Sequence, residues 1–139
     1  MFRKFAILSA TMITCAGIAW AADPSPTEKL MEGINKNHQA IRKATNSAAN
    51  YKKGAASIPK EVEELVKRAK EAREIKDSSE VAKKPFAEWQ KLMDDMIKSA
   101  EEVSKVAAKT GSTQVQAKEA YTTYNKTCAA CHSVFKKDE

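Results

Sequence analysis

Residues 112–137 read STQVQAKEAYTTYNKTCAACHSVFKK, and this stretch decides the fold class. Its inward-facing candidates recur in alternating steps of four and three residues, the spacing of a helix face that packs against other helices. These positions are Ala117, Tyr121, Tyr124, Cys128, Cys131 and Phe135. The stretch predicts a long helix, capped by Ser112 or Thr113, with both cysteines facing inward.

The chain before this stretch has the caps and apolar spacing of three further helices. We expect them to cover about residues 25–54, 57–79 and 85–111. Their expected inward positions are Leu30, Ile34, Ile41, Ala44, Ala48, Val62, Leu65, Val66, Ala69, Ala72, Phe86, Trp89, Met93, Met96 or Ile97, Ala100, Val103 and Ala107. Because short loops make sequential helices neighbours that run in opposite directions, the fold expected is an all-α, antiparallel four-helix bundle.

The composition narrows the class of protein. Four Gly and four Pro in 139 residues exclude collagen-like and low-complexity chains. Hydrophobic residues make up 42% and charged residues 30%, which suffices for a core, and 6% aromatic residues argue against a β-sandwich. The net charge of +6 is mild and mixed along the chain, so we expect no nucleic-acid partner.

The N-terminus has the pattern of an exported protein. Two basic residues precede an uncharged apolar stretch, and Ala19 and Ala21 are the small residues that signal peptidase prefers. We expect residues 1–21 to be a signal peptide and residues 22–139 to form one periplasmic domain without membrane insertion. A membrane anchor is the weaker interpretation, because the apolar stretch is shorter than the roughly 20 residues that span a bilayer. A lipoprotein acylated at Cys15 is weaker too.

The segment Cys128-Ala129-Ala130-Cys131-His132 is the strongest chemical signal in the sequence. Residues three apart share a helix face, so the two sulfurs can reach the two vinyl groups on one edge of a haem and form thioethers. The adjacent imidazole can then turn onto the iron. We expect one covalent haem c, attached through Cys128 and Cys131, with His132 as the proximal iron ligand.

Three other interpretations of the cysteine pair compete with haem. A thioredoxin-like redox pair would follow a strand in a βαβ setting, whereas this pair ends a helical stripe. A zinc site needs further ligands, and the chain has only one other histidine, His38. A disulfide that closes so short a loop would stabilise little. The spacing favours haem over all three.

A haem motif at the end of a fourth helix, followed after two residues by Phe135 and Lys136, resembles the cytochrome c prime family and its low-spin, methionine-ligated relatives. The resemblance covers nearly the whole mature chain. Residues 29–37, KLMEGINKN, are similar to the family's distal segment, where one side chain projects over the free face of the haem. Met31 falls on that position.

The resemblance implies a cytochrome domain over residues 22–139, with Met31 as the distal iron ligand opposite His132. High-spin members of the family carry Leu, Tyr or Phe at the distal position and leave the iron five-coordinate. Phe86 and Trp89 are similar to the aromatic start of the family's third helix. Dimers built from the first two helices are also implied, although the charged surface leaves a monomer open.

Two positions depart from the family pattern. Lys136 stands where the family usually has Arg, and Thr27 stands where an Arg commonly lies one turn before the distal position. Lys29 and Lys126 are the remaining candidates for pairing with the haem propionates.

Other side chains offer alternatives at the iron. Without the resemblance, the position of Met31 on an apolar helix face indicates a residue that packs in the core. His38 lies seven residues further on the same face and is the alternative distal ligand. Met93 and Met96 fit the core, and we expect Tyr121, Tyr124 and Trp89 to pack against the haem or within the core.

The function expected is single-electron transfer to redox protein partners, without a substrate site and therefore without enzymatic activity. Lys126, Lys136 and Lys137 form a basic group near the motif that would steer an acidic partner. A five-coordinate, gas-binding cytochrome and a haem-free helical interaction protein are the two alternatives.

Overall fold

The computed structural model describes residues 23–136, and these residues form helices and turns without any strand. The elements are α1 (Pro26–Thr45), α2 (Ala48–Gly54), the short 3-10 helix η1 (Ala55–Ser57), α3 (Ile58–Arg73), α4 (Asp77–Ala82), α5 (Phe86–Ala108) and α6 (Gln114–Phe135). The expected all-α class is confirmed. Within this range no helix combines the length and apolar character needed to cross a membrane. The expected signal peptide and Lys137 lie outside the described residues.

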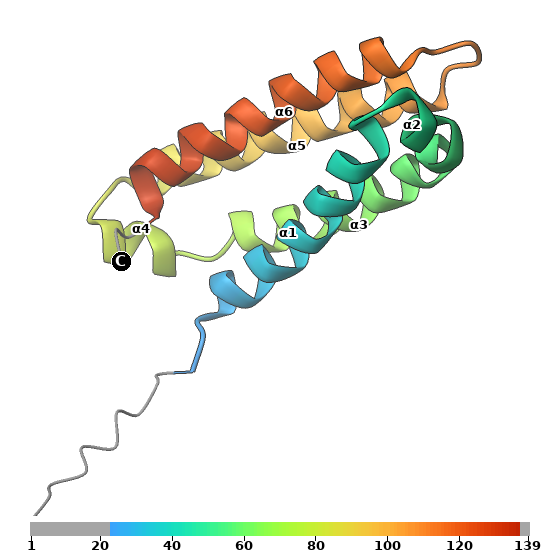
Figure 1. Cartoon of the computed structure of the whole chain (residues 1–139). Helices are drawn as coiled ribbons and strands as arrows, with labels where there is room; N and C mark the ends of the chain where they lie inside the picture. Colours follow the sequence, from blue (N-terminus) through green and yellow to red (C-terminus); the bar gives the residue numbers. More distant parts are fainter. Residues whose placement is uncertain (1–22, 137–139) are drawn as a thin grey trace, which may run out of the picture.

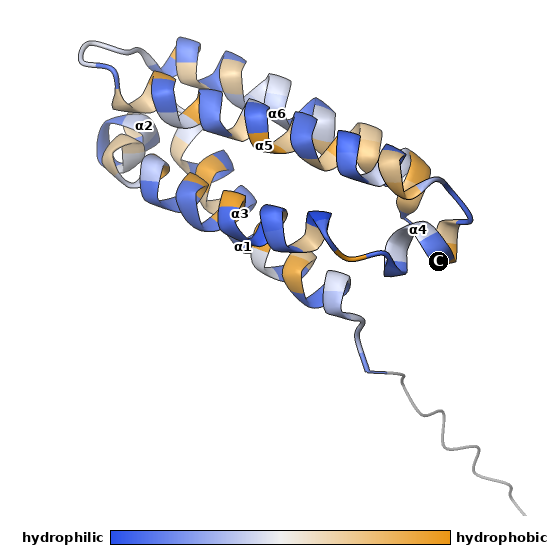
Figure 2. Cartoon of the chain, turned by 180° about the vertical axis from the view of Figure 1, so that it is seen from behind, coloured by the Kyte–Doolittle hydropathy of each residue, from blue (hydrophilic) through white to orange (hydrophobic). Residues whose placement is uncertain are grey.

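The long helices form two layers, α1 with α3 and α5 with α6 (Figures 1 and 2). α3 packs along both α1 and α5, and α5 packs along α6, whereas α1 and α6 approach each other less closely. α1 and α6 run in opposite directions (Figure 1). The layers therefore meet most tightly along α3 and α5.

The first helix begins where the sequence predicts and ends earlier. The Ser25 hydroxyl accepts a hydrogen bond from the Glu28 amide, and the Glu28 carboxylate accepts one from the Ser25 amide, a complete capping box. The expectation of one helix to residue 54 is wrong, because α1 ends at Thr45. The Ser47 hydroxyl accepts a bond from the Asn50 amide and starts the separate helix α2, as polar side chains that compete for backbone groups do.

The second and third expected helices also differ at their ends. α3 stops at Arg73 instead of near residues 76–79, and the short α4 follows it. α5 ends at Ala108, just before Gly111, which has a φ of 78° in the turn to α6. Glycine is favoured there because it adopts this left-handed conformation without steric cost.

The core confirms the predicted helix faces with one exception. Ala48 is exposed because it lies on α2 and not on a continued α1, while every other expected inward position is buried or half-buried. The larger side chains buried completely, or almost so, include Ile41, Ile58, Leu65, Met93, Val103 and Tyr124. Apolar residues gather along one side of each long helix (Figure 2).

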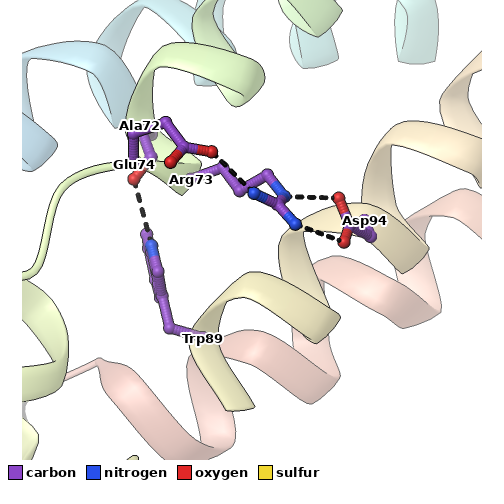
Figure 3. A network of polar contacts seen from close by, with 5 residues as sticks. All are labelled: Ala72, Arg73, Glu74, Trp89 and Asp94. Atoms are coloured by element: carbon purple, nitrogen blue, oxygen red, sulfur yellow. Dashed lines mark hydrogen bonds and ion pairs between the residues drawn. The ribbon is translucent and has the colours of Figure 1, made fainter. Parts of the chain in front are cut away.

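Trp89 and Arg73 fasten the end of α3 to α5 (Figure 3). The buried Trp89 donates from its indole nitrogen to the Ala72 carbonyl at 3.0 Å. The Arg73 guanidinium donates to both carboxylate oxygens of Asp94, at 2.7 and 3.0 Å. Trp89 also meets Phe135 of α6 edge to face, with ring centroids 5.3 Å apart. Trp89 is thus a core residue that links three helices near the end of α6.

Candidate haem site

The cysteine motif occupies the last turns of α6, and its two thiols are free. Thr113 starts the helix with a second capping box, in which its hydroxyl accepts from the Gln116 amide. Cys131 is buried and Cys128 is half-buried, so both lie inward as expected. Burial raises the pKa of both thiols, that of Cys131 to about 11. Both thiols are therefore protonated at neutral pH, and neither sulfur is in a disulfide.

His132 lies next to Cys131 with its side chain largely exposed. Partial burial, and then the charge of Lys136, lower the pKa of its imidazole. The ring is therefore neutral at neutral pH, and neutral imidazole is the form that binds a metal ion.

Two hydrogen bonds fix the register between α1 and α6. The Tyr121 hydroxyl and His38 Nε2 are 3.0 Å apart, and Gln114 Nε2 donates to the Thr45 carbonyl at 2.7 Å. His38 lies seven residues before Thr45 on α1, and Tyr121 lies seven residues after Gln114 on α6. The two bonds therefore share one antiparallel register.

The same register places Met31 level with the motif. Seven residues before His38 along α1 is Met31, and seven residues after Tyr121 along α6 is Cys128. Each step moves about 10 Å along its helix. Met31 is half-buried against the core, and by this register it is level with Cys128 along the two helices.

Met93 and Met96, the other methionines singled out from the sequence, are buried core residues of α5. Their side chains confirm the expectation that they belong to the core stripe. Met31 is thus the methionine of the described helices that combines partial exposure with a place level with the cysteines.

His38 is engaged by two tyrosines of α6. Its ring lies 5.4 Å from that of Tyr121 and 5.6 Å from that of Tyr124, centroid to centroid. Burial, then the charges of Arg42 and His132, lower its pKa. The Nε2 atom of His38 is hydrogen-bonded to Tyr121. His38 therefore lies two helix turns away from the level of Met31 and Cys128.

Thr27 has a partner that the sequence does not reveal. Its backbone amide donates to Asp77 Oδ2 at 3.2 Å, and its hydroxyl donates to Asp77 Oδ1. α4 thereby fixes the first turn of α1, one turn before Met31. Lys29, Lys126 and Lys136 are exposed, without an ion pair among residues 23–136.

These residues fit a covalently attached haem. Two free thiols lie one turn apart, a neutral imidazole follows them, and a thioether side chain lies level with them on the opposite helix. Tyr124, one helix turn before Cys128, also has a buried hydroxyl without a hydrogen-bond partner. Sequence reasoning missed this hydroxyl, since only the packing shows that it is unpartnered.

A separate open groove of about 760 Å³ lies between α3 and α5, away from the motif. Charged side chains of both helices, including Lys67, Glu101 and Lys105, line it. Within residues 23–136 no three His, Cys, Asp or Glu side chains gather as metal ligands. Comparison of the chain with protein-family models, curated proteins and solved structures finds no match.

Proposed function

We propose that this protein is a periplasmic, monohaem c-type cytochrome of the cytochrome c prime type, an antiparallel four-helix bundle that carries single electrons. The observation that carries the proposal is the register of α1 and α6, which brings Met31 level with Cys128. A proximal histidine and a distal methionine on opposing helices are the ligand set of a six-coordinate, electron-transferring haem.

Each residue of the site has a separate role in this proposal. Cys128 and Cys131 would hold the haem through thioethers, and His132 and Met31 would supply the protein ligands of its iron. When bound, the haem supplies a one-electron ferric–ferrous couple, which a methionine ligand shifts toward the ferrous state. The Thr27–Asp77 link and the His38–Tyr121 bond hold α1, and with it Met31, in place.

The deciding experiment is expression of the full chain with a haem-attachment system, followed by intact-mass analysis and absorption spectroscopy. We expect a mature chain that begins near Ala22 and carries the mass of one haem. The ferric protein should be low-spin with a weak far-red band, and CO should bind the ferrous protein slowly, because the Met31–iron bond must break first. A purified chain with the mass of the bare polypeptide would overturn the proposal and favour a haem-free interaction protein.

One observation keeps the gas-binding alternative as a second candidate. α1 and α6 approach each other less closely than the other neighbouring long helices do, so little packing between these two helices would hold Met31 close to the motif. A ferric protein that is high-spin as isolated, with rapid CO binding after reduction, would favour this alternative.

A further inference from the structure

Tyr124 carries a buried hydroxyl that has no hydrogen-bond partner. The side chain is 0% exposed, and its oxygen is the only buried side-chain polar atom in residues 23–136 without a partner. Its ring packs against those of His38 and Tyr121, with centroids 5.6 and 6.1 Å away. A buried hydroxyl without a partner is costly, so native proteins rarely keep one without a reason.

Cys128 is the polar side chain one turn after Tyr124 on the same inward face of α6. The hydroxyl makes no hydrogen bond of ordinary geometry to this sulfur, yet the two groups affect each other's ionisation. Burial, followed by Cys128, raises the pKa of Tyr124, and the Tyr124 hydroxyl offsets part of the rise that burial causes in the pKa of Cys128. The one-turn spacing on a shared inward face therefore makes Cys128 the cysteine of the motif nearest to Tyr124 along α6.

The second cysteine has different surroundings. Cys131 is buried, and it lies seven residues after Tyr124, two helix turns away along α6. The two cysteines of the motif therefore differ in their access to a hydrogen-bond donor.

We propose that Tyr124 is a positioning residue that donates its O–H to the sulfur of Cys128, so that Cys128 forms its thioether before Cys131. The inference rests on the proposed haem attachment. In that reaction a bond forms between Sγ and one vinyl carbon, the carbon–carbon π bond breaks, and the thiol proton goes to the other vinyl carbon. No electrons are gained or lost overall.

The donor acts before and after the reaction. The thiolate is the attacking form of a cysteine, and a hydrogen bond from Tyr124 both stabilises and orients it. Once the thioether has formed, the sulfur has no proton and can only accept, so the Tyr124 hydroxyl keeps a partner.

Single-cysteine variants of the full chain test the proposal. Cys131→Ser keeps only Cys128 and Cys128→Ser keeps only Cys131; each is expressed with a haem-attachment system, with and without Tyr124→Phe. Intact mass gives the fraction of chains that carry haem. We expect Tyr124→Phe to lower this fraction several-fold in the Cys131→Ser background and to leave the Cys128→Ser background unchanged.

Tyr51→Phe is the matched control, because it removes the buried tyrosine hydroxyl that bonds to Ser112 at the opposite end of α6. Tyr51→Phe should leave the fraction of chains that carry haem unchanged in both backgrounds. If Tyr124→Phe lowered the haem-carrying fraction by the same factor in both backgrounds, its role would be merely structural. If it lowered the fraction in neither background, the proposal would also be overturned.

A second measurement separates this inference from the proposed function. Haem-free full chains of the same variants are alkylated with iodoacetamide, with helix content followed by circular dichroism. Tyr124→Phe should slow the alkylation of Cys128 several-fold and leave that of Cys131 unchanged; an unchanged rate at Cys128 overturns the role of Tyr124. Wild-type chains that never acquire haem would contradict the proposed function alone.

Discussion

At the scale of single residues, Met31 is the side chain whose substitution distinguishes the proposed electron carrier from the gas-binding alternative. Replacing Met31 with Leu should turn a low-spin, six-coordinate iron into a high-spin, five-coordinate one that binds CO rapidly. The reduction potential should fall, because a ligand that favours ferrous iron is lost. Absorption spectra with and without CO, together with redox titration, measure these changes.

Met93 provides the control for this substitution, because it is a completely buried methionine on α5. Met93→Leu makes the same chemical change in the core, at a cost of less than about 1.5 kcal/mol of stability, and should leave the spectrum unchanged. An unaltered spectrum in Met31→Leu would reject Met31 as a ligand and make His38 the candidate.

At the scale of elements, the first turn of α1 depends on Asp77 of α4. Burial raises the pKa of Asp77, but hydrogen bonds from Thr27, Ser25 and the Ser78 amide outweigh it, so the pKa is lowered overall. A carboxyl with a lowered pKa in the folded state stabilises the fold above its unfolded pKa, and this contribution is lost as pH falls through the folded value.

We therefore expect Asp77→Asn to cost about 1 kcal/mol at neutral pH and to reduce the loss of stability below about pH 4. Chemical denaturation from pH 2.5 to pH 7 measures both effects. Glu80→Gln, on the same helix and exposed, is the matched control. The link would have no energetic role if Asp77→Asn and wild type lost stability in parallel as the pH falls.

The elements also show how much of the fold is predictable from sequence. Caps such as Ser25 and Thr113, and the apolar spacing of α3, α5 and α6, are local, so the helices and their inward faces follow from the residues themselves. The sequence does not predict the break between α1 and α2, because the apolar spacing continues across Asn46 and Ser47.

The site is predictable only in part, for a related reason. The spacing of Cys128, Cys131 and His132 is local and visible in the sequence. The bond between His38 and Tyr121 joins residues 83 positions apart, so no local pattern could show which residue of α1 lies opposite the motif. The sequence indicates Met31 only through resemblance to a family, and the helix register supplies an independent reason.

At the scale of the whole molecule, exposed lysines lie on the second half of α6 and just after it, where they would face the redox partner that we propose. Lys126 and Lys136 are exposed, and Lys137 continues the group outside the described residues. If they steer an acidic redox partner, the rate of electron exchange should fall steeply as ionic strength rises from about 0.01 to 0.2 M. Stopped-flow kinetics measures this dependence.

Two double variants test whether these lysines cause the dependence of the rate on ionic strength. Lys126→Gln with Lys136→Gln should weaken the salt dependence, whereas Lys52→Gln with Lys53→Gln, on the exposed face of α2, should preserve it. Rates that are indifferent to ionic strength in the wild type would contradict steering altogether.

The register between α1 and α6 also bears on the order in which the chain folds. α3 can pack on α1, α5 on α3 and α6 on α5 as successive long helices. The bonds that join α1 to α6 connect residues 69 and 83 positions apart, and such distant contacts carry the largest loop-closure entropy. Docking of α1 onto α6 should therefore be the last folding event, so Met31 and Cys128 come level only when the rest of the molecule is already in place.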